Sequence, residues 1–101
     1  MKLTDLEPRW LSPDVFMFKN PTGGSHWLTC KRIRMAYRDQ CKLVWEDHPE
    51  YKGWPIVLTE PDCAWQFAGN DFATMTVRPS LNFNPSGDFH GFITNGEVTN
   101  A

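Results

Sequence analysis

The sequence has few cysteines and no long apolar run. Its three cysteines, Cys30, Cys41 and Cys63, are an odd set without the regular spacing of a disulfide framework. No stretch approaches the ~20 apolar residues that cross a membrane, and the opening Met-Lys-Leu-Thr-Asp lacks the apolar core of a signal peptide. These absences predict a protein of the reducing cytoplasm that does not enter a membrane.

An excess of charge of one sign is also lacking. Ten Lys and Arg stand against 12 Asp and Glu, a formal net charge of −2, which argues against non-specific binding to nucleic-acid phosphates or to an anionic membrane. The charges are nevertheless grouped, with a basic segment followed by an acidic one. Two solvated faces or one dipolar surface would each produce this pattern. The basic residues are Lys31, Arg32, Arg34 and Arg38, and the acidic ones are Glu46, Asp47, Glu50, Glu60 and Asp62.

Aromatic residues, by contrast, are abundant. Five Trp and seven Phe are spread along the whole chain, and each buried ring removes a large apolar area from water. A chain of 101 residues has the size of one domain and can bury roughly two thirds of the surface of its unfolded form. We therefore expect a single domain over residues 1–101 whose core can form without metal or disulfide.

The apolar pattern predicts a mainly β fold: a small antiparallel sheet of hairpins with at most one short helix. A dense group of turn formers at 20–24 separates the first two predicted strands and suggests a hairpin. Asn95-Gly96 between the last two predicts a type I′ turn, which needs positive φ at both positions. The predicted strands are residues 14–18, 26–30, 72–78, 89–94 and 97–99.

The remaining segments are less regular. Residues 31–46 fit both an alternating strand and one helical face, and we favour the strand slightly. Residues 1–13 carry Pro8 and Pro13 and predict an extended arm that packs Trp10. The proline-rich stretch 48–61 is mostly loop, with a short edge strand at 56–59, and residues 80–88 are a further loop.

Histidines and cysteines provide the only candidate metal ligands outside the carboxylates. A structural zinc site needs four converging ligands, and the chain has no Cys-x-x-Cys pair, so buried free thiols are the simpler interpretation and we expect no bound metal. If a zinc ion is held, the candidate ligands are Cys30, Cys63, His90 and His26. Asp88, His90 and Glu97 could meet across the final hairpin, but a His beside carboxylates is usually a structural residue, so we predict no catalytic site.

Trp, Tyr and Arg are the favoured anchors of protein interfaces, and several lie in the acidic, proline-rich middle of the chain. The five Trp exceed what a small β core usually needs, so either some are exposed anchors or all are core and half-core residues. The predicted interface residues are Trp45, Glu46, Asp47, Glu50, Tyr51, Trp54, Arg34 and Arg38.

The C-terminal third resembles a family of small phage and prophage proteins of unknown function. The resemblance rests on the block from Ser86 to Glu97, Ser-Gly-Asp-Phe-His-Gly-Phe-Ile-Thr-Asn-Gly-Glu, and on Asp71–Val77 with the Pro-Ser-Leu that begins at Pro79. The segments 3–11 and 27–30 fit the family as well. Relatives carry a zinc-knuckle-like Cys-Pro-x-Cys where this chain has Asn-Pro-Thr-Gly from residue 20, and His-Trp-His-Gly where it has Asp-Phe-His-Gly from residue 88.

The resemblance implies a phage or mobile-element protein of the bacterial cytoplasm that lacks its relatives' metal ligands. Our leading hypothesis is a non-enzymatic accessory protein that binds and inhibits a host protein assembly, for example an anti-CRISPR protein that occludes a CRISPR effector. Either the acidic stretch Glu46–Asp62 imitates nucleic acid, or the Trp-rich loops enter a protein pocket. A zinc-stabilised domain with a structural or hydrolytic metal is the alternative. Nucleic-acid binding through Lys31–Arg38 is the third hypothesis, weakened by the net acidity.

Overall fold

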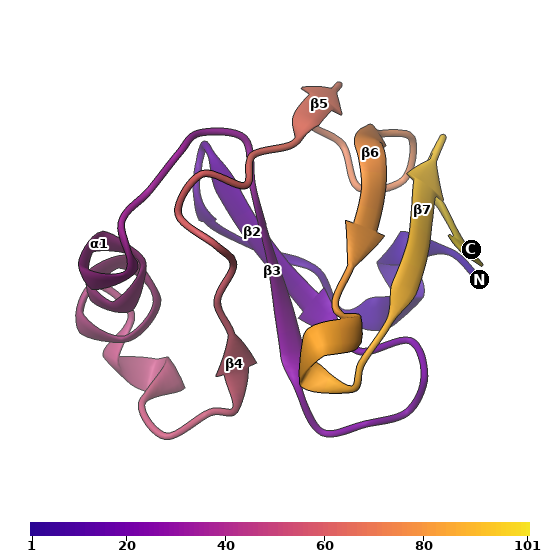
Figure 1. Cartoon of the computed structure of the whole chain (residues 1–101). Helices are drawn as coiled ribbons and strands as arrows, with labels where there is room; N and C mark the ends of the chain where they lie inside the picture. Colours follow the sequence, from indigo (N-terminus) through magenta and orange to yellow (C-terminus); the bar gives the residue numbers. More distant parts are fainter.

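Eight short strands form two four-stranded sheets that face each other, and a helix covers the outer side of the first sheet (Figure 1). Figure 1 is a computed structural model that describes all residues 1–101. The first sheet has the order β1 (Arg9–Ser12), β2 (Val15–Lys19), β3 (Trp27–Lys31) and β4 (Ile56–Val57). The second has the order β5 (Gln66–Ala68), β6 (Thr76–Asn82), β7 (His90–Thr94) and β8 (Glu97–Asn100). The predicted mainly β fold is confirmed, although as two sheets.

All neighbouring strands pair antiparallel except β3 and β4, which are parallel. The predicted edge strand at 56–59 is therefore present in shortened form, at the edge of the first sheet. The hairpin predicted between residues 14 and 30 is β2–β3. The type I′ turn between β7 and β8 is confirmed as well, because Asn95 and Gly96 have φ values of 48° and 76°.

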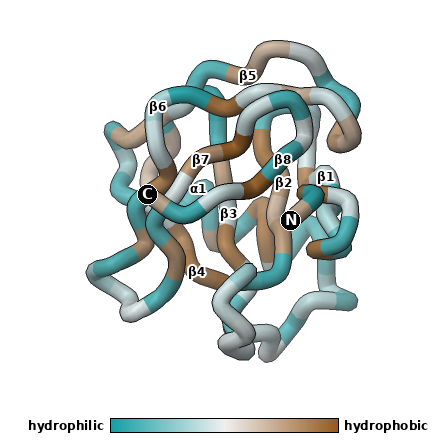
Figure 2. Tube along the Cα trace, turned by 90° about the vertical axis from the view of Figure 1, so that its right-hand side faces the viewer, coloured by the Kyte–Doolittle hydropathy of each residue, from teal (hydrophilic) through white to brown (hydrophobic).

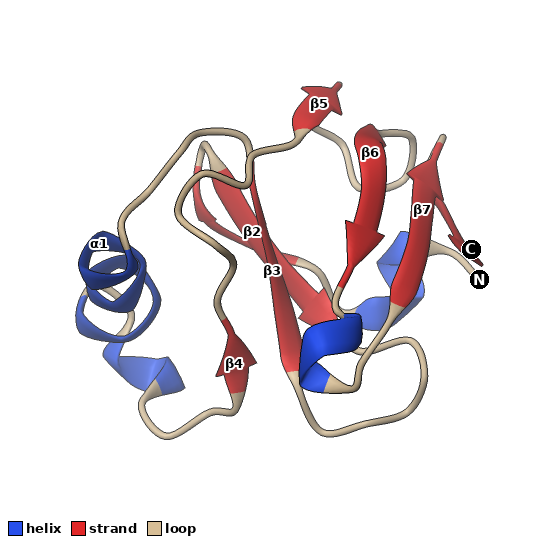
Figure 3. Cartoon of the chain, viewed as in Figure 1, coloured by secondary structure: helices blue, strands red, loops and turns tan.

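The strand favoured over residues 31–46 is wrong. Only Lys31 belongs to a strand, and α1 (Tyr37–Cys41) continues directly into a π-helical turn, η2 (Lys42–Glu46) (Figure 3). Gln40 and Val44, four positions apart, are buried and face the first sheet, while Arg38 and Asp39 are exposed. The segment is therefore an amphipathic helix that covers this sheet. None of the helices combines the length and hydropathy that crossing a membrane requires.

Two further predictions need correction. The arm over residues 1–13 contains a 3₁₀ turn, η1 (Leu3–Leu6), and strand β1. The strand predicted at 72–78 begins late, because Asp71 caps a turn in which its carboxylate accepts the N–H of Ala73, and β6 then runs on to Asn82 into the predicted loop. Single 3₁₀ turns, η3 (Pro49–Tyr51) and η4 (Asn84–Ser86), complete the chain.

The first sheet supplies side chains to two hydrophobic cores. Because side chains alternate along a strand, Phe16 and Phe18 of β2 point to the second sheet, whereas Val15 and Met17 point to the helix. This placement explains why four consecutive residues of β2 are all buried. In Figure 2 the apolar segments follow β4, β7 and β8, and hydrophilic loops surround them.

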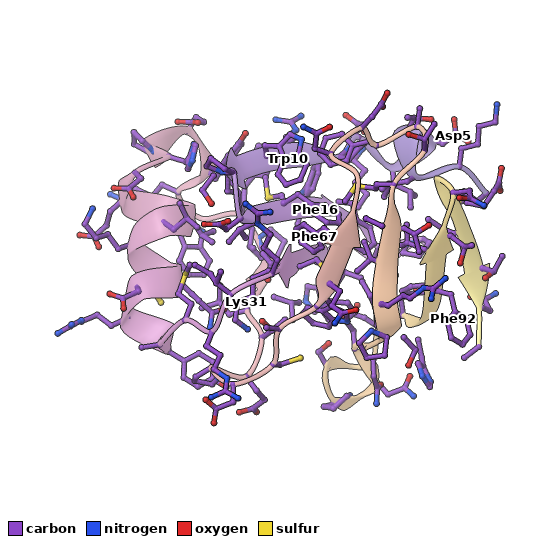
Figure 4. The ribbon with its side chains drawn as sticks, turned by 90° about the horizontal axis from the view of Figure 1, so that it is seen from above. Asp5, Trp10, Phe16, Lys31, Phe67 and Phe92 are labelled. Atoms are coloured by element: carbon purple, nitrogen blue, oxygen red, sulfur yellow. The ribbon has the colours of Figure 1, made fainter.

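Aromatic rings fill the space between the two sheets. Trp10 and Phe16 lie with ring centroids 5.6 Å apart, and Phe16 and Phe67 5.4 Å apart. Figure 4 shows these three side chains turned toward one another. Phe72 lies in the loop between β5 and β6, and its ring stacks on that of Trp10 with the centroids 5.0 Å apart. The expectation that Trp10 packs against the body of the protein is thus confirmed.

Candidate interaction surface

A cluster of three aromatic rings surrounds the guanidinium of Arg9 on the helix-facing side of the first sheet. The Cζ atom of Arg9 lies 5.2 Å from the ring centroid of Trp27, 5.8 Å from that of Tyr51 and 5.4 Å from that of Trp54. The rings also contact one another, with Trp27 and Trp54 5.1 Å apart and Tyr51 and Trp54 4.7 Å apart. We call Arg9, Trp27, Tyr51 and Trp54 the Arg9 box.

Strand register explains how these residues meet. Lys19 and Trp27 pair across the β2–β3 hairpin, and Arg9 pairs with Met17 on β1 and β2, so Arg9, Lys19 and Trp27 point to the same face of the sheet. The η3 turn and the loop after it then bring Tyr51 and Trp54 over that face. The N–H of Trp54 donates to the carbonyl of Tyr51 at 3.0 Å, which closes this loop.

Charged groups border the box at both ends. Glu7 forms ion pairs with Lys19 and, at 3.9 Å, with Arg9. Lys19 lowers the pKa of the Glu7 carboxyl, first through its hydrogen bond and then through its charge. The charge of Arg9 lowers this pKa further, whereas burial acts in the opposite direction. At the other end, His48 stacks on Tyr51 at 5.6 Å, and Oε1 of the Glu50 carboxylate accepts a hydrogen bond from Nδ1 of His48 at 3.2 Å. The cation–π cluster is therefore held between two carboxylates.

The outer edge of the box reaches the surface. Trp27 and Tyr51 are buried, but Trp54 is half-buried and 39% of the Arg9 side chain is exposed. A guanidinium near an aromatic ring is attracted by the ring's negative face, which restricts the motion of both groups before any partner binds. Trp, Tyr and Arg are also the residue types that contribute most to protein interfaces. The arrangement suits a preorganised contact surface.

The structure divides the predicted interface residues into three groups. Tyr51 and Trp54 belong to the Arg9 box, and Glu50 lies beside it. Trp45, Glu46 and Asp47 are at the end of η2, where Trp45 is half-buried and its Nε1–H is buried without a hydrogen-bond partner. The exposed Arg34 and Arg38 lie before and within α1, at the opposite end of the helical segment.

The structure also decides the question that the tryptophan count left open. Trp27 and Trp65 are buried, and Trp10, Trp45 and Trp54 are half-buried. All five are therefore core or half-core residues, and none is a fully exposed anchor. Arg9 and Trp27 were missed as site residues because nothing in the sequence shows the pairing register that unites them.

The candidate metal ligands are not gathered into a site. Cys30 is buried in the core between the sheets, Cys63 packs at its edge and His90 is half-buried on β7. His26 is hydrogen-bonded to Asp88, with Nδ1 2.8 Å from Oδ2. No group of three or more His, Cys, Asp or Glu side chains is arranged to hold a metal ion.

Asp88 is the centre of a polar network that the sequence did not indicate. Its carboxylate accepts hydrogen bonds from Nδ2 of Asn20 at 2.7 Å and Oγ of Ser86 at 2.6 Å, besides the contact with His26. Burial alone would raise the pKa of this carboxyl, but the hydrogen bonds from Ser86, His26 and Asn20 outweigh it and lower the pKa. Glu97, one of the residues that could have met Asp88 across the final hairpin, pairs with the N-terminal amine at 3.5 Å.

The basic segment 31–38 does not form a continuous cationic surface. Lys31 is buried, and its amine donates to Oγ1 of Thr59 and, at 2.7 Å, to the carbonyl of Glu60. Arg32 is paired with Asp14 at 2.6 Å. Arg34 and Arg38 are thus the residues of this segment that extend freely into solvent, too few for a nucleic-acid footprint of the predicted kind.

We compared the chain with models of protein families, with curated proteins and with solved structures, and none of them matches it. The geometry described above is therefore the basis for inferring function.

Proposed function

We propose that this chain is a non-enzymatic binding protein that contacts a partner protein through the Arg9 box and the half-exposed residues around it. The observation that carries the proposal is the guanidinium of Arg9 within 6 Å of three aromatic rings, with Arg9 and Trp54 still accessible from solvent. The rings already hold Arg9 in place, so these side chains lose little conformational freedom when a partner binds. Less of the contact energy is then offset by lost entropy than at a flexible surface.

Charge pairing favours this surface over imitation of nucleic acid by the acidic stretch. Asp47 is neutralised by Lys42, whose Nζ lies 2.6 Å from its Oδ1, and Glu50 contacts His48. Asp62 lines a shallow surface groove together with Arg34. Basic side chains next to these carboxylates offset their negative charge, so this surface attracts a basic partner only weakly. We therefore favour insertion or stacking of the partner at the Arg9 box.

The identity of the partner rests on the resemblance of residues 86–97 to phage and prophage proteins. Small proteins of such elements commonly act by occupying a surface of a larger host complex. We propose a cytoplasmic host assembly, in particular a defence complex such as a CRISPR effector, as the partner, and occlusion as the mode of inhibition.

The test compares the wild-type protein with Arg9→Ala and Trp54→Ala in affinity capture from lysate of a bacterial host that carries a CRISPR system. The captured complex is then purified and its dissociation constant measured for each variant. We expect Arg9→Ala and Trp54→Ala to weaken binding about tenfold or more, as loss of an interface anchor does. Arg38→Ala is the matched control, because its fully solvated guanidinium lies outside the box, and should change affinity less than twofold.

Salt dependence provides a second criterion. Binding through the Arg9 box should change little with added salt, whereas binding through the acidic stretch should weaken steeply. The proposal is wrong if both box variants bind like the wild type, or if no host protein is retained by the wild-type chain. Folding of each variant is checked by its amide NMR spectrum.

A further inference from the structure

A pocket that shares no residue with the Arg9 box lies at the edge of the first sheet, where Val57 of β4 and Tyr37 of α1 approach the η4 turn. It has a volume of about 170 Å³. Its walls come from Tyr37 at the start of α1, the end of β4 and the chain after it, the segment before β5, and the end of β6 with the η4 turn. Residues far apart in sequence therefore form one concave site.

The walls of the pocket are mainly apolar. Leu58, Trp65 and Phe83 line it, with the thiol-bearing Cys63 between them in sequence. A cavity of about 150 Å³ in a protein core accommodates one benzene molecule. The pocket is thus large enough for one aromatic ring or a short alkyl chain, and too small for a nucleotide or a peptide.

Glu60 is the only charged residue that lines the pocket, and its carboxylate is exposed. The exposed Tyr37 lines the same pocket; desolvation raises the pKa of its hydroxyl, and the hydrogen bond with Glu60 and the charge of Glu60 raise it further. Lys31 is buried and does not line the pocket, and its amine is held by the Thr59 hydroxyl and the Glu60 carbonyl. The entrance to the pocket therefore presents negative charge and a hydrogen-bond group beside apolar walls.

We propose that this pocket binds a small organic cation: an ammonium group on an apolar body no larger than one ring or a short alkyl chain. The apolar body lies against Leu58, Trp65 and Phe83, and the ammonium group lies at Glu60 with Tyr37 beside it. Apolar walls with a few placed polar groups are the usual composition of small-molecule sites. The inference is independent of the Arg9 box, so either can fail without the other.

The test is an NMR titration of the ¹⁵N-labelled full chain with three probes of one size: benzylamine, benzyl alcohol and benzoate. We expect benzylamine to shift the Trp65 indole signal and the amides of Leu58 and Cys63 saturably, benzyl alcohol to bind more weakly and benzoate not at all. Glu60→Gln should weaken benzylamine binding about fivefold, the effect of one charge pair at a partly exposed site, and leave benzyl alcohol within twofold.

Glu46→Gln is the matched control, because Glu46 is an exposed carboxylate that does not line the pocket. It should leave both affinities unchanged. The proposal is overturned if no probe gives saturable shifts at the pocket, if benzoate binds as well as benzylamine, or if Glu60→Gln and Glu46→Gln behave alike. Because Glu60 is exposed, its substitution leaves the core intact and the comparison remains interpretable.

Discussion

His26 and Asp88 are 62 positions apart in the sequence, yet the Nδ1 atom of His26 lies 2.8 Å from Oδ2 of Asp88. The contact joins the β2–β3 loop of the first sheet to the segment between η4 and β7 of the second. Asn20, from the same loop as His26, donates to the other carboxylate oxygen. Since only 6% of the Asp88 side chain is exposed, this network fastens the two sheets together at one end.

Asp88→Asn should therefore destabilise the protein. An amide presents one acceptor oxygen and a donor, so it cannot accept from Asn20, His26 and Ser86 together. We expect the free energy of unfolding to fall by about 1–3 kcal/mol, measured by urea denaturation. Asp39→Asn, an exposed carboxylate with only a 3.9 Å contact to Arg38, should change stability by less than about 0.5 kcal/mol. Equal effects of the two substitutions would contradict the role assigned to Asp88.

The same carboxylate should contribute to acid unfolding. Its pKa is lower in the folded chain than in the unfolded one, so its stabilising effect is present above the unfolded value of about 3.9 and is lost as the pH falls through the folded value. The stability difference between wild type and Asp88→Asn should be constant near neutral pH and shrink below about pH 4. Urea denaturation of both proteins at a series of pH values measures this difference in unfolding free energy. A difference that stays constant below pH 4 would show that the Asp88 carboxyl does not contribute to acid unfolding.

Lys31 should also make stability rise with pH, but in the alkaline range. Burial lowers the pKa of its amine, while the acidic groups around it, including Cys63, Cys30 and Glu60, act in the other direction. A lysine whose folded pKa lies below its unfolded value makes the protein more stable as the pH rises toward the unfolded value, because the unfolded chain then binds more protons.

Lys31→Met removes this titrating amine and keeps the length of the side chain. The stability of the wild type relative to Lys31→Met should increase between neutral pH and the ordinary lysine pKa of 10.5. Chemical denaturation of both proteins across this range gives the difference directly, and titrating groups that do not interact with Lys31 cancel in it. A difference independent of pH would mean that the amine titrates alike in the folded and unfolded chains.

Local signals in the sequence were sufficient for the hairpins. The turn formers at 20–24 and Asn95-Gly96 act within a few residues, so their effect does not depend on the rest of the fold. The helix at 37–46 was missed for the opposite reason. Its position is fixed by Gln40, whose side chain accepts the N–H of Thr59 at 3.1 Å and donates to the Thr59 carbonyl at 2.8 Å, and by the uncovered face of a sheet. Neither is visible in residues 31–46 themselves.

The candidate site was partly predictable for a related reason. Tyr51 and Trp54 could be selected by residue type within one segment. Arg9 joins them only through the β1–β2 pairing and Trp27 through the β2–β3 pairing, and the strand β1 was itself hidden in a proline-flanked arm. The face of the sheet to which Arg9 points depends on the register of the β1–β2 pairing. A shift of this register by one residue would turn Arg9 toward the core between the two sheets.

Several residues of the block 86–97 have structural roles. Asp88 joins the sheets, and Asn95 and Gly96 form the turn between β7 and β8. Gly91 lies where the backbone of β8 and the ring of Phe89 approach it closely. These residues thus specify the turns and packing of the second sheet, and none of them belongs to the Arg9 box.

Gly91→Ala tests this interpretation of the block. Gly91 is buried, and a Cβ atom there would collide with the carbonyl oxygen of Thr99 and the ring of Phe89, neither of which can move without disturbing the β7–β8 pairing or the core. We expect a loss of more than about 3 kcal/mol in unfolding free energy, or failure to fold. Gly23→Ala is the control: its φ of +88° disfavours alanine, but nothing lies within 4 Å of the added Cβ. It should cost only about 1 kcal/mol. Similar losses in both variants would show that close packing at β7 does not require glycine at position 91.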